Sequence, residues 1–183
     1  MHSLTKPFRI WRRVTIGSGL SELQLVENIF NAGCKIREPA AEFIERSYFS
    51  VSSVREEVDF VLVAVMQLGL IRASLETLVE RARELGLRPC TVEEALALRI
   101  QYSKEQMNDG QVELISLAMD PIETKFKQKY HRPSVLCLAG GKASFSEKPE
   151  LTVRHLYSGV RGKGASYDGL DHEVWAFVSP RKN

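Results

Sequence analysis

The sequence predicts an α+β protein: a helical N-terminal half around a buried strand, followed by a mainly antiparallel β C-terminal half. Helix start and stop signals with 3.6-residue apolar periodicity are concentrated in the first half, and short apolar segments separated by turn residues follow. One segment, residues 58–66, is apolar on both faces except for Asp59, which is typical of a strand covered on both sides.

The polar, turn-like stretch 103–110 marks the change in character. We therefore expect a helix-rich half over residues 1–102, with its central strand at 58–66, and a β-rich half over residues 111–183. The two halves should form one compact unit.

Length and composition narrow the class of protein. With 183 residues, of which 44% are apolar and 26% charged, the chain resembles an ordinary soluble protein that needs no metal or disulfide to fold. Its longest apolar run, residues 60–66, is far shorter than the roughly 20 residues that span a bilayer, and its start lacks a secretory signal. Three widely spaced cysteines fit reduced thiols, so we expect a cytoplasmic protein without membrane contact.

A strand and two helices are predicted first. Apolar and basic residues partly alternate over 8–16 and indicate a short strand that ends at Gly17. Ser21 suits a helix N-cap, and Gly33 closes that helix. Pro39 suits the first turn of the next helix.

The clearest helix signals lie between residues 74 and 97. Ser74 is an N-cap, and Gly86 ends the helix that it starts. Thr91 and Glu94 form a capping box that starts a second helix. The apolar stripe of the first helix comprises Leu75, Leu78, Val79, Ala82 and Leu85. We expect this stripe to pack on the buried strand.

From residue 98 the spacing changes to alternation, which predicts an extended segment over 98–102. Alternation places Arg99 and Gln101 on one face. Together with Tyr102, and with Asp120 and Trp175 from the second half, they are a candidate recognition surface. The alternative is a polar sheet face with both aromatic residues in the core.

The second half reads as a series of strands. A strand over 111–119 is broken by Asp120-Pro121, and Gly140-Gly141 indicates a tight hairpin. A glycine-rich loop, residues 158–170, contains a basic run at 159–164 that lacks the sequence of a nucleotide-binding loop. The other predicted strands are 135–138, 143–145, 151–157 and 174–178.

A resemblance to known proteins rests on three segments, RARELGLRPCTVEEALALRIQY, LISLAMDPI and VWAFVSPRK. The chain resembles a group of uncharacterised bacterial proteins of similar size over residues 8–182, and residues 125–132 depart from their pattern. The resemblance implies a bacterial, soluble, free-standing protein and carries over no activity and no catalytic residue.

Two patterns raise the possibility of an enzyme. Glu123 and Lys125, spaced as in the Glu-x-Lys half of a metal-dependent nuclease, need a second carboxylate, which Asp59 or Glu113 would supply. The alternative is a solvated loop. Cys90 before a helix start would be an activated nucleophile or, alternatively, a buried packing residue.

For Cys90, His155 or His172 is the candidate base. The four histidines show no zinc-ligand spacing, so we expect no metal and no cofactor.

The strongest binding signal is the basic N-terminal cluster. Arg9, Arg12 and Arg13 surround Trp11, and cations beside an aromatic ring hold phosphates and stack bases. The alternative is a solvated rim around a core tryptophan. The net charge of +2 is too small to indicate nucleic acid without such local clustering.

The sequence thus favours a non-catalytic cytoplasmic binding protein. Its partner would be another protein, a second copy of the chain joined through an uncovered strand edge, or nucleic acid. The alternative is a small metal-dependent hydrolase or nuclease built on Asp59, Glu123 and Lys125.

Overall fold

The computed structural model describes residues 8–71, 73–103, 114–126, 130–140, 148–156, 166–167 and 174–179. Its helices are α1 (Glu22–Asn31), α2 (Glu38–Ser47), α3 (Leu75–Glu84) and α4 (Val92–Gln101), with a short 3-10 helix, η1, at Val65–Leu68. Its strands are β1 (Ile10–Ile16), β2 (Lys35–Ile36), β3 (Glu56–Ala64), β4 (Ala73–Ser74), β5 (Leu114–Leu117), β6 (Ile122–Phe126), β7 (Tyr130–Ala139), β8 (Glu150–His155), β9 (Ser166–Tyr167) and β10 (Val174–Ser179).

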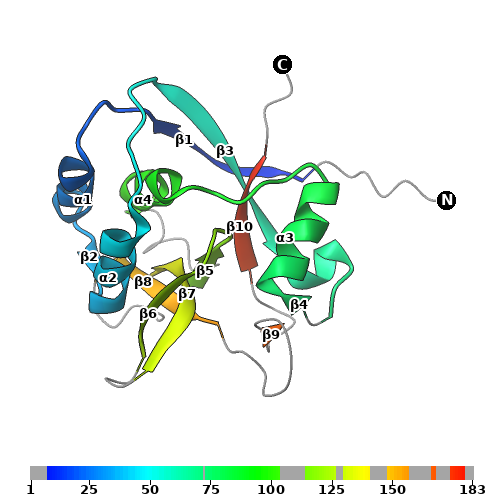
Figure 1. The fold of residues 1–183 in the computed structure, drawn as a ribbon. Coiled ribbons are helices and arrows are strands. Elements are labelled where there is room, and N and C mark those ends of the chain that lie inside the picture. The colour runs from blue at the N-terminus through cyan, green and yellow to red at the C-terminus, as the bar shows by residue number, and fades with distance from the viewer. Residues whose placement is uncertain are drawn as a thin grey trace.

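One mixed sheet joins strands from both ends of the chain (Figure 1). Its order is β1-β3-β10-β5-β7-β8-β2, and β6 pairs with β7. The last strand, β10, lies between β3 and β5, antiparallel to the first and parallel to the second. β2 pairs with β8 in parallel, and β4 and β9 form a separate two-stranded sheet.

The predicted fold class is therefore wrong. The first half is not a helical unit around one strand, because β1, β2 and β3 all join the large sheet beside strands of the second half. The fold is mixed α/β, with parallel and antiparallel pairs in the same sheet. Local periodicity failed here because it identifies single elements, whereas strand pairing is set between segments far apart in the chain.

The predicted start, end and buried stripe of α3 are confirmed, but its predicted packing on the buried strand is not shown. Ser74 Oγ accepts a hydrogen bond from Thr77 N, and Gly86 adopts φ +80° beyond the helix end. Leu78 is only 3% exposed, and the rest of the predicted stripe is buried except for the half-buried Leu85. α3 contacts η1, which continues the chain from β3.

The capping box of α4 is also confirmed, because Thr91 and Glu94 exchange both bonds, but the extended segment over 98–102 is wrong. α4 continues through Gln101. The helix is buried on almost every side, with Leu96, Leu98 and Arg99 fully buried. A helix surrounded by core has no polar stripe, so its sequence loses the 3.6-residue period that would identify it.

Most of the other predicted elements agree with the structure. Ser21 caps α1 with a capping box, and Pro39 lies in the first turn of α2. β3 begins two residues earlier than predicted and ends at Ala64, where η1 begins. The predicted segment 143–145 and the basic run 159–164 lie outside the described residues.

In the part of the chain that the structure describes, no helix combines the length and the apolar character needed to cross a membrane.

Candidate functional site

Two clusters predicted separately from the sequence meet between β1 and α4. Trp11, Arg12 and Arg13 belong to β1, and Gln101 and Tyr102 lie at the C-terminal end of α4, which packs against β1. We refer to these five residues as the β1–α4 site. The backbone brings them together although about 90 residues separate them in the chain.

A β-bulge explains how Arg12 reaches the aromatic residues. The register against β3 shifts between Ile10 and Arg12, so Trp11 is an extra residue in the strand. Such a bulge re-aims side chains. The Trp11 and Tyr102 rings make an edge contact, with centroids 4.8 Å apart at 78°.

The guanidinium of Arg12 lies over both rings, 5.5 Å from the Trp11 centroid and 4.9 Å from the Tyr102 centroid. Trp11 and Arg12 are half-buried, whereas Tyr102 is only 1% exposed. The cation is therefore held in a fixed position by the two aromatic faces.

Gln101 pairs with the outer edge of β1. Its side-chain Oε1 accepts a hydrogen bond from Thr15 N at 3.0 Å, and its Nε2 donates to Thr15 O at 2.8 Å. A neighbouring strand would make this same pair of bonds. The backbone N–H and C=O of Thr15 therefore point away from β3. Along an antiparallel strand this direction alternates from one residue to the next, so the N–H and C=O of Arg13, two residues earlier, also point away from β3.

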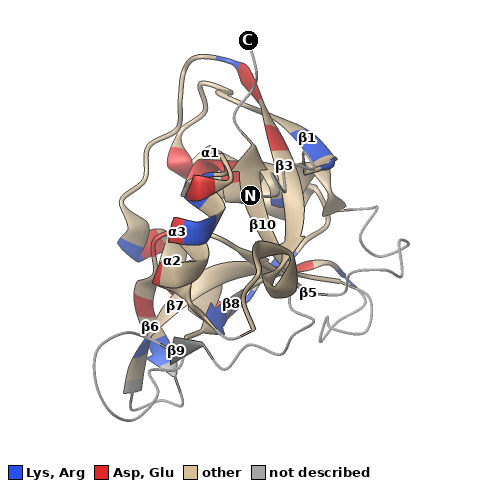
Figure 2. Cartoon of the chain, turned by 90° about the vertical axis from the view of Figure 1, so that its right-hand side faces the viewer, with Lys and Arg blue, Asp and Glu red and all other residues tan. Residues whose placement is uncertain are grey.

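Arg13 is largely neutralised. Its Nε and Nη2 donate to the two oxygens of Asp59 on β3 at 2.6 and 3.0 Å, and Glu57 lies 3.9 Å from Nη1. The hydrogen bond to Asp59 is the main cause that raises the pKa of Arg13. Figure 2 shows basic positions on β1 beside acidic positions on β3. Arg9, at the start of the described chain, is exposed.

Arg99 does not belong to this site. It lies in α4 but is fully buried, and its Nη1 donates to the backbone oxygen of Glu150 at 3.4 Å. Burial lowers its pKa. Asp120 is exposed beyond β5 and Trp175 is buried in β10, so the recognition surface predicted from Arg99, Asp120 and Trp175 is not assembled.

The predicted metal residues are also apart. Asp59 lies in β3 and is bonded to Arg13, whereas Glu123 and Lys125 lie in β6, whose partner β7 is separated from β3 by β10 and β5. The Glu123 segment is a strand and not the solvated loop of the alternative interpretation. Among the described residues, no group of three or more metal-ligating side chains converges. Glu113 lies outside the described residues.

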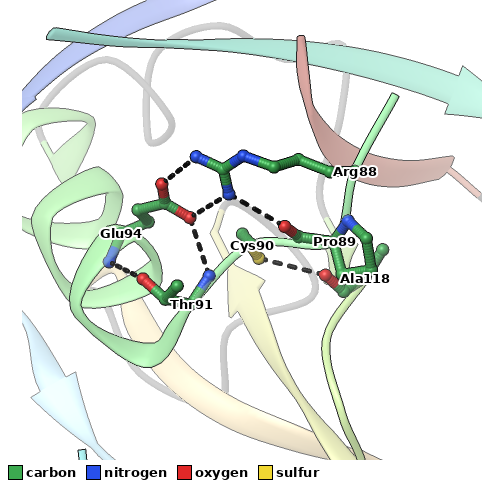
Figure 3. Close-up of polar contacts among 6 residues, drawn as sticks. All are labelled: Arg88, Pro89, Cys90, Thr91, Glu94 and Ala118. Atoms are coloured by element: carbon green, nitrogen blue, oxygen red, sulfur yellow. Dashed lines mark hydrogen bonds and ion pairs between the residues drawn. The ribbon is translucent and has the colours of Figure 1, made fainter. Parts of the chain in front are cut away.

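Cys90 is enclosed in a junction that ties the α3–α4 connection to the sheet (Figure 3). Its thiol donates to Ala118 O at 3.2 Å, and Arg88 makes two bonds to the Glu94 carboxylate at 2.5 and 2.9 Å. Burial is the main cause that raises the pKa of Cys90, and the Glu94 carboxylate adds to it. A thiol held in its neutral form is a poor nucleophile, so this geometry favours the packing interpretation of Cys90.

His155 makes its described hydrogen bond to Ser134 and not to Cys90. Its Nδ1 lies 2.9 Å from the hydroxyl of the fully buried Ser134 on β7. Burial, followed by the charge of Arg132, lowers the pKa of His155. His172, the other candidate base, lies outside the described residues.

Sequence reasoning missed the role of Thr15 and the pairing of Arg13 with Asp59. Opposite charges within two predicted strands, Arg13 in 8–16 and Asp59 in 58–66, were the available signal for the Arg13 pairing, because cross-strand neighbours of opposite charge stabilise a sheet. No local signal indicated that a glutamine would pair with a strand edge. No family model, curated protein or solved structure matches the chain, so its function is inferred from its own geometry.

Proposed function

We propose that the protein is a non-catalytic binding protein that holds an extended, acidic segment of a partner protein along the outer edge of β1. The observation that carries this proposal is the pairing of the Gln101 amide with both backbone groups of Thr15. At Thr15 the edge of β1 makes the two hydrogen bonds that a neighbouring strand would make. The backbone N–H and C=O of Arg13, two residues earlier, point outward in the same way. Added strands bind sheet edges through such bonds.

The charge of the edge supports an acidic occupant. Arg12 is fixed over the two rings, and Arg9 is exposed nearby in the chain. An exposed guanidinium such as that of Arg9 forms charge-assisted hydrogen bonds with a carboxylate. A second copy of β1 would instead bring two basic edges together, so self-association is disfavoured.

Nucleic acid is less well supported than a protein segment. Tyr102 is buried and Trp11 packs against it, so these two rings do not form an exposed pair on which bases would stack. Asp59 and Glu57 also compensate Arg13, which removes one of the three positive charges from phosphate binding.

A reducing compartment is part of this proposal. Cys34, Cys90 and Cys137 are all free and buried. Such thiols support a cytoplasmic protein, because disulfides are the norm in oxidising compartments.

The test uses a labelled octapeptide of alternating Glu and Val, whose binding is followed by fluorescence anisotropy. Two variants isolate the edge: Arg13→Pro removes the outward N–H, while Arg13→Ala loses the same ion pair but keeps that N–H. Edge strands tolerate proline where the N–H faces outward. We expect Arg13→Pro to bind about three- to ten-fold more weakly than Arg13→Ala, the value of one hydrogen bond.

Two peptide controls accompany the variants. A Lys-Val peptide should not bind, and a Glu-Val peptide N-methylated along one edge should lose binding to the unaltered protein. Equal affinity of Arg13→Pro and Arg13→Ala, or of the methylated and plain peptides, would contradict the proposal.

The nucleic-acid alternative is tested in the same assay with single- and double-stranded probes over a salt series. If those probes bind and the triple variant Arg9→Ala, Arg12→Ala, Arg13→Ala lowers the salt slope by about one unit per lost phosphate contact, the partner is nucleic acid and the proposal is wrong.

A further inference from the structure

A hollow of about 350 Å³ lies on the other side of the molecule from α1, between α3, the segment after β5 and the end of β8. In Figure 1, α3 stands apart from α1, α2 and α4. The hollow is separate from the β1–α4 site, because none of that site's residues line it. Its volume falls in the range of small-molecule sites.

The floor of the hollow is apolar. Leu75 and Val79 come from α3, Met119 follows β5, and Leu156 follows β8. All four side chains are between 1% and 8% exposed. An apolar group that enters the hollow would therefore leave water and contact packed side chains.

The rim is charged and mainly acidic. Of the described residues that line the hollow, the charged ones are Glu76, Glu80, Asp120 and Arg83. Within the described part of the chain, none of these four groups takes part in an ion pair. The three carboxylates are exposed to solvent.

The charges leave room for one cation. Glu76 lies in the first turn of α3, where its carboxylate compensates the positive end of the helix dipole. The two other carboxylates stand against the one positive charge of Arg83, so the described rim keeps an excess of negative charge over an apolar floor. We propose that this hollow binds a small organic cation with an apolar body, a primary alkylamine in its simplest form.

This inference goes beyond the proposed function, and neither depends on the other. An alkylamine would place its chain against Met119 and Leu156 and its ammonium group at the rim near Glu80 and Asp120. Each methylene group placed on the floor is worth about a four-fold gain in affinity. The attraction of one exposed carboxylate is worth about two- to five-fold.

The experiment follows ¹³C-methyl methionine NMR of the full chain during titration with n-hexylamine. Met119 lines the hollow, and the exposed Met66 in η1 serves as the internal control. A Met119→Leu variant assigns the signal. We expect a saturable shift of the Met119 methyl without a shift at Met66, and on the order of ten-fold weaker binding of n-butylamine.

Charge is tested with matched ligands and variants. n-Hexanol should bind about two- to five-fold more weakly than n-hexylamine. Glu80→Gln and Asp120→Asn should weaken the amine by similar factors and leave n-hexanol unchanged. Glu84→Gln is the control on the same helix, because Glu84 pairs with Arg81 and does not line the hollow.

Several results would overturn the inference. The absence of a saturable shift at Met119 would exclude a site. Equal affinity for hexanol and hexylamine, or an amine affinity unchanged in both Glu80→Gln and Asp120→Asn, would show that charge plays no part. Tighter binding of n-hexanesulfonate would assign the hollow to an anion held by Arg83.

Discussion

Single side chains in this protein are constrained mainly by burial and by the charge next to them. Arg99 and Cys34 illustrate this at one place in the core: burial raises the pKa of the thiol and lowers that of the guanidinium, while the Arg99 charge partly opposes the shift of Cys34. At Cys90 burial and the Glu94 carboxylate act in the same direction. The neutral thiol is therefore the form that the folded protein stabilises.

This gives a pH dependence with a defined sign. The pKa of Cys90 in the folded protein lies above that of an unfolded cysteine, about 8.5, so the folded state holds its proton more tightly. The stabilising effect is complete below about pH 8.5 and is lost as the pH rises toward the folded-state pKa. We expect the free energy of unfolding to fall above pH 8.5 by up to about 1.4 kcal/mol per pH unit for one buried thiol, and the urea midpoint to fall with it.

The measurement is urea unfolding between pH 7.5 and 9.5 for the unaltered protein, Cys90→Ala and Cys90→Ser. Both variants remove the titrating thiol, so the free energy of unfolding of both should change less with pH. This holds even if a variant is less stable than the unaltered protein at every pH. Parallel curves for all three proteins would refute the assignment.

The helices of this fold are recognised more clearly by the capping residues at their ends than by the apolar stripes on their faces. Ser21, Ser74 and Thr91 each accept a hydrogen bond from the first turn of the helix that follows. α2 is different, since Arg37 at its N-cap makes no side-chain cap and the helix begins at Glu38-Pro39. Caps were readable from the sequence because cap and partner are only three residues apart.

The cap of α4 supports a testable expectation. Thr91→Ala removes the hydroxyl that accepts from Glu94 N and should lower the free energy of unfolding by about 1 kcal/mol. Thr91→Ser keeps an acceptor and should recover most of that loss. Glu94 would retain its bonds to Arg88, so the affinity of the Glu-Val peptide should stay unchanged. A Thr91→Ala variant as stable as the unaltered protein would show that the cap contributes nothing.

At the scale of the whole molecule, the sheet makes the two ends of the chain depend on each other. β3 has β1 on one edge and β10 on the other, and β10 also pairs with β5. Arg88 in the α3–α4 connection bridges to Val178 through two backbone bonds of 2.9 Å. The helical half predicted over residues 1–102 therefore lacks β10, the strand that pairs with the second edge of β3.

A fragment of residues 1–102 tests this dependence. Without β10, one edge of β3 and its apolar face stay exposed, so we expect no cooperative urea transition and a weak near-ultraviolet circular dichroism signal from Trp11, its one tryptophan. The full chain is the control. A cooperative unfolding transition in the fragment would show that residues 1–102 fold without the second half of the chain.

The sequence by itself determined the four helices, the three side-chain caps and most strands of the large sheet, although not β2 and β6, because these features depend on residues within one helical turn or one strand of each other. Only the tertiary structure decided the order of the sheet, the end of the buried helix α4 and the assembly of the β1–α4 site. The bonds between Gln101 and Thr15 join residues 86 positions apart. No local sequence pattern predicts a contact between residues so far apart in the chain, because the contact depends on how β1, β3 and α4 pack together.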